Sequence, residues 1–258
     1  MDPTELLALV DRDLREQARP DAPGAHVERC GNVVRQTAPA HGWNGVLWSR
    51  LDAAGADAAI AGQIAHFTRL RREFEWKVYG HDRPAGLGRR LTRAGFVPGP
   101  VETLMVGEAA RLHPGPELPD GVRVLPVTDA AGAGLVAEVH HEAFGTDSAW
   151  LRDQLLARLA ADPGTVVAVV ALAGGVPVSA ARMELVPGTP FAGLWGGGTV
   201  PAWRGRGIYR ALVAHRARAA SRRGHRYLQV DASDESRPIL HRLGFASLTT
   251  TTPYVYAP

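Results

Sequence analysis

Cysteine and lysine each occur once in the 258 residues, as Cys30 and Lys77. A single cysteine excludes an intramolecular disulfide, an iron–sulfur cluster and a multi-cysteine zinc site, and it is typical of a reducing cytoplasm. The longest apolar run, from Val166 to Ala173, is far shorter than the roughly 20 residues that span a bilayer. The acidic start, Met1 to Glu5, is not followed by an apolar segment, which predicts no signal peptide. We therefore expect a cytoplasmic protein without a membrane partner.

The net charge is only +3, although the sequence pI is about 9.4. Every basic residue except Lys77 is an arginine, and arginine titrates at so high a pH that a small excess raises the pI. The arginines alternate with acids in residues 11–16, and the one dense basic run, residues 69–72, is typical of a solvated helix end. We therefore expect no nucleic-acid partner.

What the sequence does contain is enough apolar material for a sizeable core. Hydrophobic residues make up 45% and charged residues 21%, which excludes wholesale disorder and, at this length, favours two domains. Residues 113–121 carry three prolines and two glycines, which disfavour helix and strand. We predict a linker there, between a first domain over residues 1–112 and a second over residues 122–258.

Hydrophobic periodicity predicts an alternation of helices and strands in both halves. In the first half we predict helices over residues 4–15, 57–70 and 86–94, and strands over residues 45–51, 74–79 and 101–106. In the second half we predict strands over residues 122–126, 166–173, 178–186, 192–200, 227–232 and 248–255, and helices over residues 131–143, 150–161, 208–223 and 237–243. This order indicates a mixed α+β fold.

The two halves share a closing pattern. A strand over residues 74–79 is followed by a helix, Leu91 and the pair Gly95-Phe96. A strand over residues 227–231 is followed by a helix, Leu240 and the pair Gly244-Phe245. Four features in the same order predict two tandem, related domains.

The most informative segment runs from Val200 to Leu212, where a strand ends, Arg204-Gly205-Arg206-Gly207 follows and an amphipathic helix begins. Unpaired amides at a helix start form an anion site that suits a diphosphate, and glycine lets the backbone approach it closely. A dinucleotide-binding fold is the alternative, with Asp231 as its acid. We disfavour it because Arg210 stands at the third glycine position and the preceding strands suggest an antiparallel meander.

With this loop and the Gly-Phe element, residues 122–258 resemble the GCN5-related N-acetyltransferase (GNAT) family. The family's coenzyme A loop reads Arg/Gln-x-x-Gly-x-Gly/Ala, which Arg204–Tyr209 matches except that Tyr209 replaces the last small residue. The resemblance implies an α+β protein of two GNAT-like domains, each a twisted mixed sheet flanked by helices. It also implies acetyl-CoA as acyl donor, with the pyrophosphate on the amides of residues 204–210 and the pantetheine arm beside Thr199, Val200 and Ser236. The implied cofactor-binding residues are Thr199, Val200, Arg204, Gly205, Arg206, Gly207, Ile208, Tyr209, Arg210 and Ser236.

The resemblance also bears on catalysis. His241 stands where the family often has a proton-donating tyrosine, so we consider it as the donor to the departing thiolate, with a plain polar helix residue as the alternative. Glu184, on a central strand, is our candidate base, with a surface-facing role as the alternative. Residues 196–198 are three glycines, which suit a bulge. We interpret His140-His141-Glu142 as surface helix and expect no metal.

The first half resembles a degenerate GNAT domain. Where the cofactor loop belongs, residues 52–57 carry one glycine, two acids and no arginine. Carboxylates would repel a diphosphate, so we expect this domain not to bind coenzyme A and to support the second domain or cover its acceptor site.

These observations predict an N-acetyltransferase that moves an acetyl group from acetyl-CoA to an amine of a small molecule or peptide. The alternative is a catalytically silent acyl-CoA-binding sensor or scaffold. Trp150, Trp195 and Tyr254 are candidate pocket aromatics, with core packing as the alternative. The sequence specifies neither the acceptor nor the oligomeric state, and it leaves a homodimer open.

Overall fold

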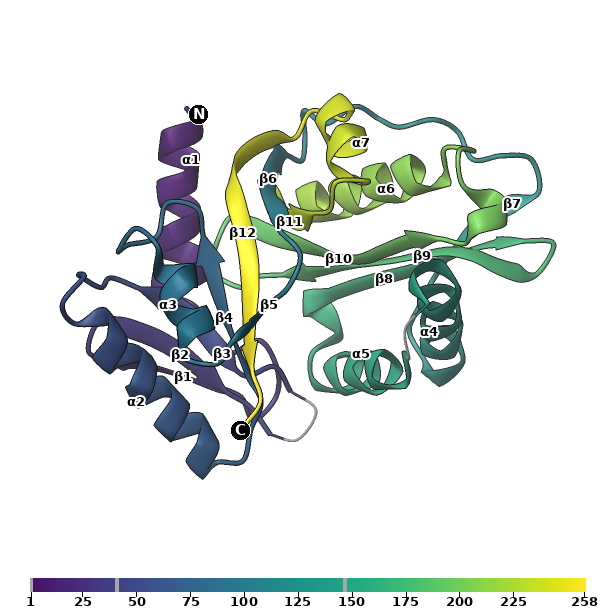
Figure 1. The fold of residues 1–258 in the computed structure, drawn as a ribbon. Helices are drawn as coiled ribbons and strands as arrows, with labels where there is room; N and C mark the ends of the chain where they lie inside the picture. The colour runs from purple at the N-terminus through teal and green to yellow at the C-terminus, as the bar shows by residue number, and fades with distance from the viewer. Residues whose placement is uncertain (1, 40–41, 146–147) are drawn as a thin grey trace. The chain divides into compact units, whose positions relative to one another are not determined.

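The computed structural model describes residues 2–39, 42–145 and 148–258. The chain forms two compact units (Figure 1). Unit 1 comprises residues 1–104, 231–234 and 248–258, and unit 2 comprises residues 105–230 and 235–247. Helices and strands alternate in a mixed α/β arrangement, which confirms the predicted fold class.

These units differ from the ranges predicted from the sequence, 1–112 and 122–258. The main difference is the last strand, β12 (Ala246–Tyr256), in which residues 251–256 pair antiparallel with residues 79–74 of β4 (Phe74–Tyr79). The end of the chain therefore completes unit 1 rather than unit 2. The predicted linker contains no helix or strand from residue 113 to residue 119, but it belongs to unit 2.

Unit 1 begins with α1 (Pro3–Val10), which continues as a π-helical turn (Asp11–Glu16). Its other elements are β1 (His26–Cys30), β2 (Val33–Thr37), β3 (Gly45–Ser49), α2 (Ala56–Arg69), β4, α3 (Leu87–Arg93), β5 (Val97–Pro98) and the start of β6 (Glu102–Glu108). The pairs β1–β2 and β2–β3 are antiparallel, and β3–β4 is parallel across α2. Strands β1 and β2 were not predicted, because β1 is polar and largely exposed and β2 carries the buried polar pair Arg35 and Gln36.

Aromatic rings form the core of unit 1. Phe67 of α2 stacks on Phe74 of β4 with ring centroids 4.2 Å apart, and Phe96 meets Phe74 edge-on at 5.2 Å. All three rings are almost fully buried, so they anchor α2 and the Gly-Phe element to the sheet.

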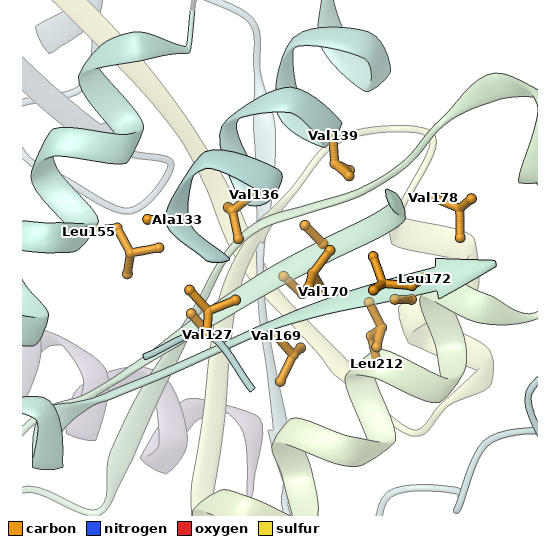
Figure 2. Packing of buried hydrophobic residues seen from close by; sticks show 14 of the residues in the cluster. Val127, Ala133, Val136, Val139, Leu155, Val169, Val170, Leu172, Val178 and Leu212 are labelled. Atoms are coloured by element: carbon orange, nitrogen blue, oxygen red, sulfur yellow. The ribbon is translucent and has the colours of Figure 1, made fainter. Parts of the chain in front are cut away.

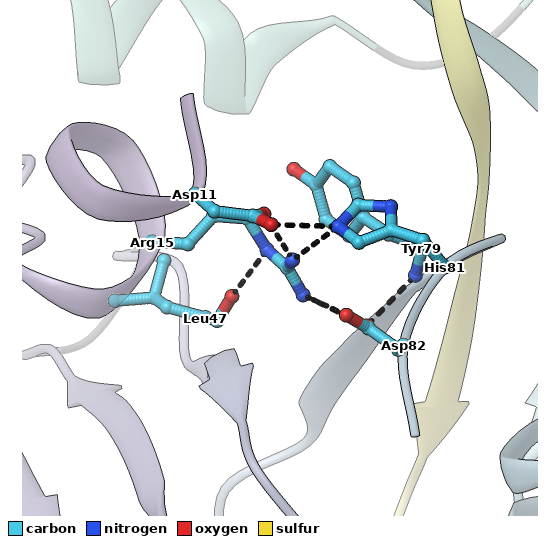
Figure 3. Close-up of polar contacts among 6 residues, drawn as sticks. All are labelled: Asp11, Arg15, Leu47, Tyr79, His81 and Asp82. Carbon is cyan, nitrogen blue, oxygen red and sulfur yellow. Dashed lines mark hydrogen bonds and ion pairs between the residues drawn. The ribbon is translucent and has the colours of Figure 1, made fainter. Parts of the chain in front are cut away.

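A buried ionic network joins the first helical segment of unit 1 to the end of β4 (Figure 3). Arg15 donates to both carboxylate oxygens of Asp82, at 2.8 and 2.7 Å, and to Asp11 at 2.5 Å. Its guanidinium lies 3.7 Å from the centre of the Tyr79 ring, and His81 Nε2 lies 2.7 Å from Asp11 Oδ2. Paired and hydrogen-bonded in this way, the buried charges are compensated.

Unit 2 contains the end of β6, then β7 (Val122–Pro126), α4 (Ala130–Phe144), α5 (Ala149–Ala161), β8 (Val166–Ala173), β9 (Val176–Leu185), β10 (Phe191–Thr199), α6 (Ile208–Arg222), β11 (Tyr227–Ala232, its first four residues) and α7 (Arg237–Arg242). Strands β7 to β10 form an antiparallel meander, and β10 pairs parallel with β11 across α6. The antiparallel meander suggested by the sequence is present, and it leads into a β-α-β unit.

Two helical layers cover the meander of unit 2, with α4 and α5 on one face and α6 on the other (Figure 1). Figure 2 shows Val136 and Val139 of α4 on one side of the central strands and Leu212 of α6 on the other. Strand β8 is apolar along its whole length because both of its faces are covered.

The two Gly-Phe closures have the same local geometry. Gly95 and Gly244 have φ of +98° and +100°, a region that favours glycine. The following residues, Phe96 and Phe245, each donate to a leucine carbonyl at 3.1 Å and are each 2% exposed. The repeat predicted from the sequence is therefore present in the structure.

Candidate functional site

A tight loop joins β10 to α6. After β10 the chain makes a short 3₁₀ turn (Pro201–Trp203), and Gly205 and Gly207 then take φ of +77° and +85°. A Cβ on Gly205 would meet nothing within 4 Å, so this part of the loop is open. A Cβ on Gly207 would lie 2.9 Å from Cγ of Pro116, so the proline-rich segment packs against the other side of the loop.

The amides of this loop are available to a ligand. Within the described chain, the six successive N–H groups of residues 205–210 have no hydrogen-bond acceptor. The next amide, of Ala211, donates to the Gly207 carbonyl and starts the helical ladder. A helix ordinarily leaves four amides free at its N-terminus, here those of residues 207–210, and the amides of Gly205 and Arg206 add two more to an anion site.

Arg204 differs from its expected role at this site. Its amide donates to the Pro201 carbonyl at 3.2 Å, so the free amides begin at Gly205. Its guanidinium donates to the carbonyls of Thr199 at 3.1 Å and Ala143 at 2.9 Å, which braces the end of β10 against α4. Arg204 thus shapes the loop rather than presenting a free charge.

The other two arginines of the loop are exposed. The Arg206 guanidinium lies 4.5 Å from the centre of the Trp203 ring. Arg210 extends from the first turn of α6 with Nη2 beside Gly207. Both carry positive charge at the rim of the loop.

Thr199 and Val200 have partners of their own. Thr199 Oγ1 lies 2.9 Å from Ser179 Oγ, and the Val200 amide donates to the Val178 carbonyl at 3.0 Å. The pantetheine arm expected beside these residues would therefore pair with the other edge of β10, the one that faces away from β9.

That edge of β10 is unpaired along most of its length. Residues 191–193 pair with residues 227–229 of β11, and no further pair with β11 occurs among the described residues although β10 continues to Thr199. On the other edge, the register against β9 shifts between Trp195 and Gly198, which is a β-bulge at Gly196 and Gly197, with Gly196 at φ +55°. The bulge expected from three successive glycines is present.

Side chains from both helical layers meet the bulge. A Cβ on Gly197 would lie 3.1 Å from the Tyr209 ring and 3.5 Å from Nη2 of Arg216, both on α6. On the other face, a Cβ on Gly196 would lie 4.0 Å from the ring of His140, on α4. The missing side chains therefore let these groups approach the backbone, and Tyr209 occupies space that Gly197 leaves.

His140 was overlooked in the sequence, because two adjacent histidines on a helix suggest a solvated surface. Its Nδ1 lies 2.8 Å from Ser148 Oγ, and its ring contacts those of Phe144 and Trp150, with centroids 4.7 and 6.5 Å apart. Burial and the nearby charge of Arg182 lower the pKa of His140 below its ordinary value. It is therefore a neutral imidazole at neutral pH.

Glu184, the predicted base, lies in an ionic cluster on the face of the sheet that α4 and α5 cover. Its carboxylate is 3.0 Å from Nη1 of Arg158 and 3.2 Å from Nε of Arg182. Two guanidinium groups thus hold the carboxylate. These contacts favour a structural role for Glu184, which holds α5 to β9.

His241 lies on α7, and Ser236 immediately precedes this helix. His241 is exposed, and its backbone carbonyl accepts the Gly244 amide at 3.0 Å. Ser236 is the N-cap residue and is half-buried, without a capping bond from its side chain. Their catalytic and cofactor-binding roles remain predictions.

The corresponding loop of unit 1 is occupied by its own acids. Asp52 Oδ1 accepts the Gly55 amide at 2.7 Å at the start of α2, and Asp57 pairs with Arg90 at 2.7 Å. A carboxylate thus takes the place that an anionic ligand would need. Asp231, the acid of the dinucleotide alternative, is paired with Lys77 at 2.7 Å.

Residues 2–39, 42–145 and 148–258 contain no cluster of three or more His, Cys, Asp or Glu side chains suited to a metal ion. None of the helices in this part of the chain has the length and apolar character needed to cross a bilayer.

Comparison with known proteins found one matching family model and several similar structures. Residues 134–245 match the model of the acetyltransferase (GNAT) family. No curated protein matches the sequence. A GCN5-related N-acetyltransferase from Kribbella flavida has a similar structure, with a TM-score of 0.71 and 19% identity over 99% of this chain and 94% of that chain.

Two further solved structures resemble the chain. A tandem GNAT protein from the clavulanic acid biosynthesis pathway has a TM-score of 0.64 and 14% identity, and covers 93% of this chain and 85% of its own. A GCN5-related N-acetyltransferase from Sphaerobacter thermophilus has a TM-score of 0.64 and 17% identity, and covers 99% and 93%. The chain thus has the fold of GNAT proteins, and its residues 134–245 carry the match to the acetyltransferase (GNAT) family.

Proposed function

We propose that the protein is an N-acetyltransferase that transfers an acetyl group from acetyl-CoA to an amine. The observation that carries this proposal is the row of six unpaired amides at residues 205–210, placed directly after a strand whose edge has separated from its neighbour. The amides suit a diphosphate, and the free edge of β10 suits an extended chain that carries its own amide groups. Coenzyme A combines both features.

On this proposal the thioester lies near the bulge of β10. The amine nitrogen attacks the thioester carbonyl carbon, the carbonyl electrons move to oxygen, and the carbon–sulfur bond then breaks with its electron pair on sulfur. The proton of the attacking amine goes to a base. His140, a neutral imidazole beside Gly196, suits this role better than Glu184, which two arginines hold. His241 is retained as a proposed donor to the thiolate.

The acceptor that fits the face of α4 and α5 is an amine on an apolar or aromatic group. Phe144 and Trp150 flank His140 and are 50% and 49% exposed, and Trp195, beside the bulge, is 39% exposed. Trp195 is directly opposite Arg182 in the β9–β10 pair, so the two side chains are on the same face of the sheet. The Arg182 side chain donates to Gln154 of α5, so this is the face that α4 and α5 cover. Exposed aromatic side chains around a neutral base suit the uncharged form of such an amine.

The test has two steps. First, coenzyme A and acetyl-CoA are titrated into the protein by calorimetry, with saturable binding expected. Second, release of the free thiol is followed with a panel of aryl, arylalkyl and aliphatic amines and N-terminal peptides. Turnover with an apolar amine supports the proposal. Binding without turnover across the panel supports the acyl-CoA sensor instead, and no binding contradicts both.

A further inference from the structure

One arginine of α6 is buried without a carboxylate. Arg216 is 1% exposed, and its hydrogen bonds are to backbone carbonyls: Nε donates to Leu212 at 3.1 Å and Nη1 to Arg182 at 2.9 Å. Within the described chain no acidic side chain pairs with it, whereas the buried Arg15 of unit 1 has two carboxylate partners. Arg216 is therefore a buried charge that carbonyl dipoles compensate only in part.

Such an arrangement is costly for folding. A buried charge loses its hydration, and without an opposite charge that loss is not recovered. Burial accordingly lowers the pKa of Arg216 to about 10, and the nearby Tyr209 opposes this shift. At neutral pH the guanidinium is still charged, so the protein keeps a cation where an apolar side chain would be more stable.

The position of this cation is specific. Its Nη2 has no hydrogen-bond acceptor among the described residues, and it lies 3.5 Å from where a Cβ of Gly197 would be. It therefore points at the β-bulge of β10, where Nη1 bonds the Arg182 carbonyl of the neighbouring strand β9. Gly197 has no side chain, so the guanidinium approaches the backbone of the bulge beside the Tyr209 ring, which lies 3.1 Å from where the Cβ would be.

We propose that Arg216 is a catalytic residue that stabilises the negative charge formed at the thioester of the bound acyl-CoA. This inference rests on the proposed function. When the amine attacks, the charge appears first on the carbonyl oxygen. When the carbon–sulfur bond breaks, the electron pair stays on sulfur as a thiolate. A fixed cation in a water-poor site stabilises both forms more than the neutral thioester.

A structural role predicts a different outcome. The carbonyl of Arg182 lies beside the bulge and accepts from Arg216, which could serve only to satisfy that carbonyl. In that case removal of Arg216 destabilises the protein and leaves bound coenzyme A unaffected. If Arg216 acts on the ligand, Arg216→Met relieves a buried charge, and we expect a melting temperature equal to or above that of the wild type.

The experiment measures the thiol of free coenzyme A bound to the whole protein, so it needs no acceptor. Thiolate absorbance is followed against pH for wild type, Arg216→Met, Arg216→Lys and, as control, Arg218→Met, which removes an exposed arginine from the same helix. We expect the wild type and the control to lower the thiol pKa by about one unit or more relative to unbound coenzyme A. The lysine variant should keep most of this shift and the methionine variant should lose it.

Turnover gives the second measurement once an acceptor is found. We expect Arg216→Met to reduce kcat roughly a hundredfold with little change in KM for acetyl-CoA, and with the same factor for succinyl-CoA. A loss confined to KM for succinyl-CoA would assign Arg216 to an acyl carboxylate and overturn the proposal. An unshifted thiol pKa in the wild type also overturns it, whatever the variants do. Failure of the wild type to bind coenzyme A contradicts the proposed function itself.

Discussion

Ser148 Oγ lies 2.8 Å from Nδ1 of His140 and fixes the orientation of an imidazole that lies beside the bulge of β10. His140→Gln removes the proposed base and should reduce kcat roughly 10²- to 10⁴-fold, with coenzyme A binding retained. Burial and Arg182 lower the pKa of His140 below the ordinary histidine value of 6.5. The decrease of kcat/KM on the acid side should therefore have its midpoint below pH 6.5.

The matched control for this prediction is His141→Gln, which changes the exposed neighbour on the same helix. It should leave the pH profile unchanged. An acid limb that persists in His140→Gln would assign the titration to another group.

The glycine loop offers a matched pair of substitutions. Gly205 and Gly224 lie at opposite ends of α6 with φ of +77° and +81°, and a Cβ on either would meet nothing within 4 Å. Gly205→Asp and Gly224→Asp therefore carry similar backbone strain. We expect calorimetry to show loss of coenzyme A binding only in Gly205→Asp, since only there does a carboxylate oppose the diphosphate. Equal affinities in the two variants would show that the loop does not hold the ligand.

The ionic network of unit 1 predicts a large effect on stability. Arg15→Met leaves Asp11 and Asp82 without their cation in a largely buried site, and should lower the free energy of unfolding by about 3–5 kcal/mol. Arg12→Met, at an exposed arginine three positions earlier, should change it little. Urea unfolding of the two variants checks this difference, and a stable Arg15→Met protein would contradict it.

Acid should destabilise the fold through a second histidine. Burial, with Arg218, Arg222 and Arg216, lowers the pKa of His215 in the folded chain. Below about pH 6.5 the unfolded chain therefore binds more protons at this position than the folded chain. The contribution of neutral His215 to the free energy of unfolding is complete above about pH 6.5 and is lost as the pH falls through and below that value. His215→Gln should flatten the dependence of unfolding free energy on pH between about 7.5 and 5.5, and an unchanged slope would refute the assignment.

The equivalent glycines of the two Gly-Phe closures give a test of the repeat. Gly95→Ala and Gly244→Ala both force a side chain into a left-handed conformation, and each should cost about 1–2 kcal/mol in unfolding free energy. Similar losses in the two variants are expected because the local bonds are alike. Tolerance of alanine at either position would indicate that its backbone conformation is not required.

The local sequence pattern was sufficient to predict the bounds of those segments whose structure depends mainly on their own residues. Strands β7, β8 and β11 have the predicted bounds, and the order of strand, glycine loop and helix around residues 199–212 is as expected. In these segments the apolar periodicity, the glycines and the helix-start residues all indicate the same secondary structure, and long-range contacts do not change it.

Long-range contacts account for what the sequence did not reveal. The partner of β12 depends on hydrogen bonds to β4, about 175 residues earlier in the chain, which no local pattern encodes. His140 is a helix residue whose role depends on β10 and Ser148, and Arg204 turned out to bond Ala143. The side chains of the candidate site therefore required the structure, whereas its backbone loop did not.

The pairing of β12 with β4 has a consequence for biosynthesis. A ribosome releases β4 long before residues 251–256 exist, so the nascent first unit waits with one edge of β4 lacking its final partner. The meander of unit 2 can form before β12 is synthesised. Strand β12, made after the other strands of both units, then completes the sheet that was begun first, which makes residues 251–256 a requirement for the N-terminal half of the protein.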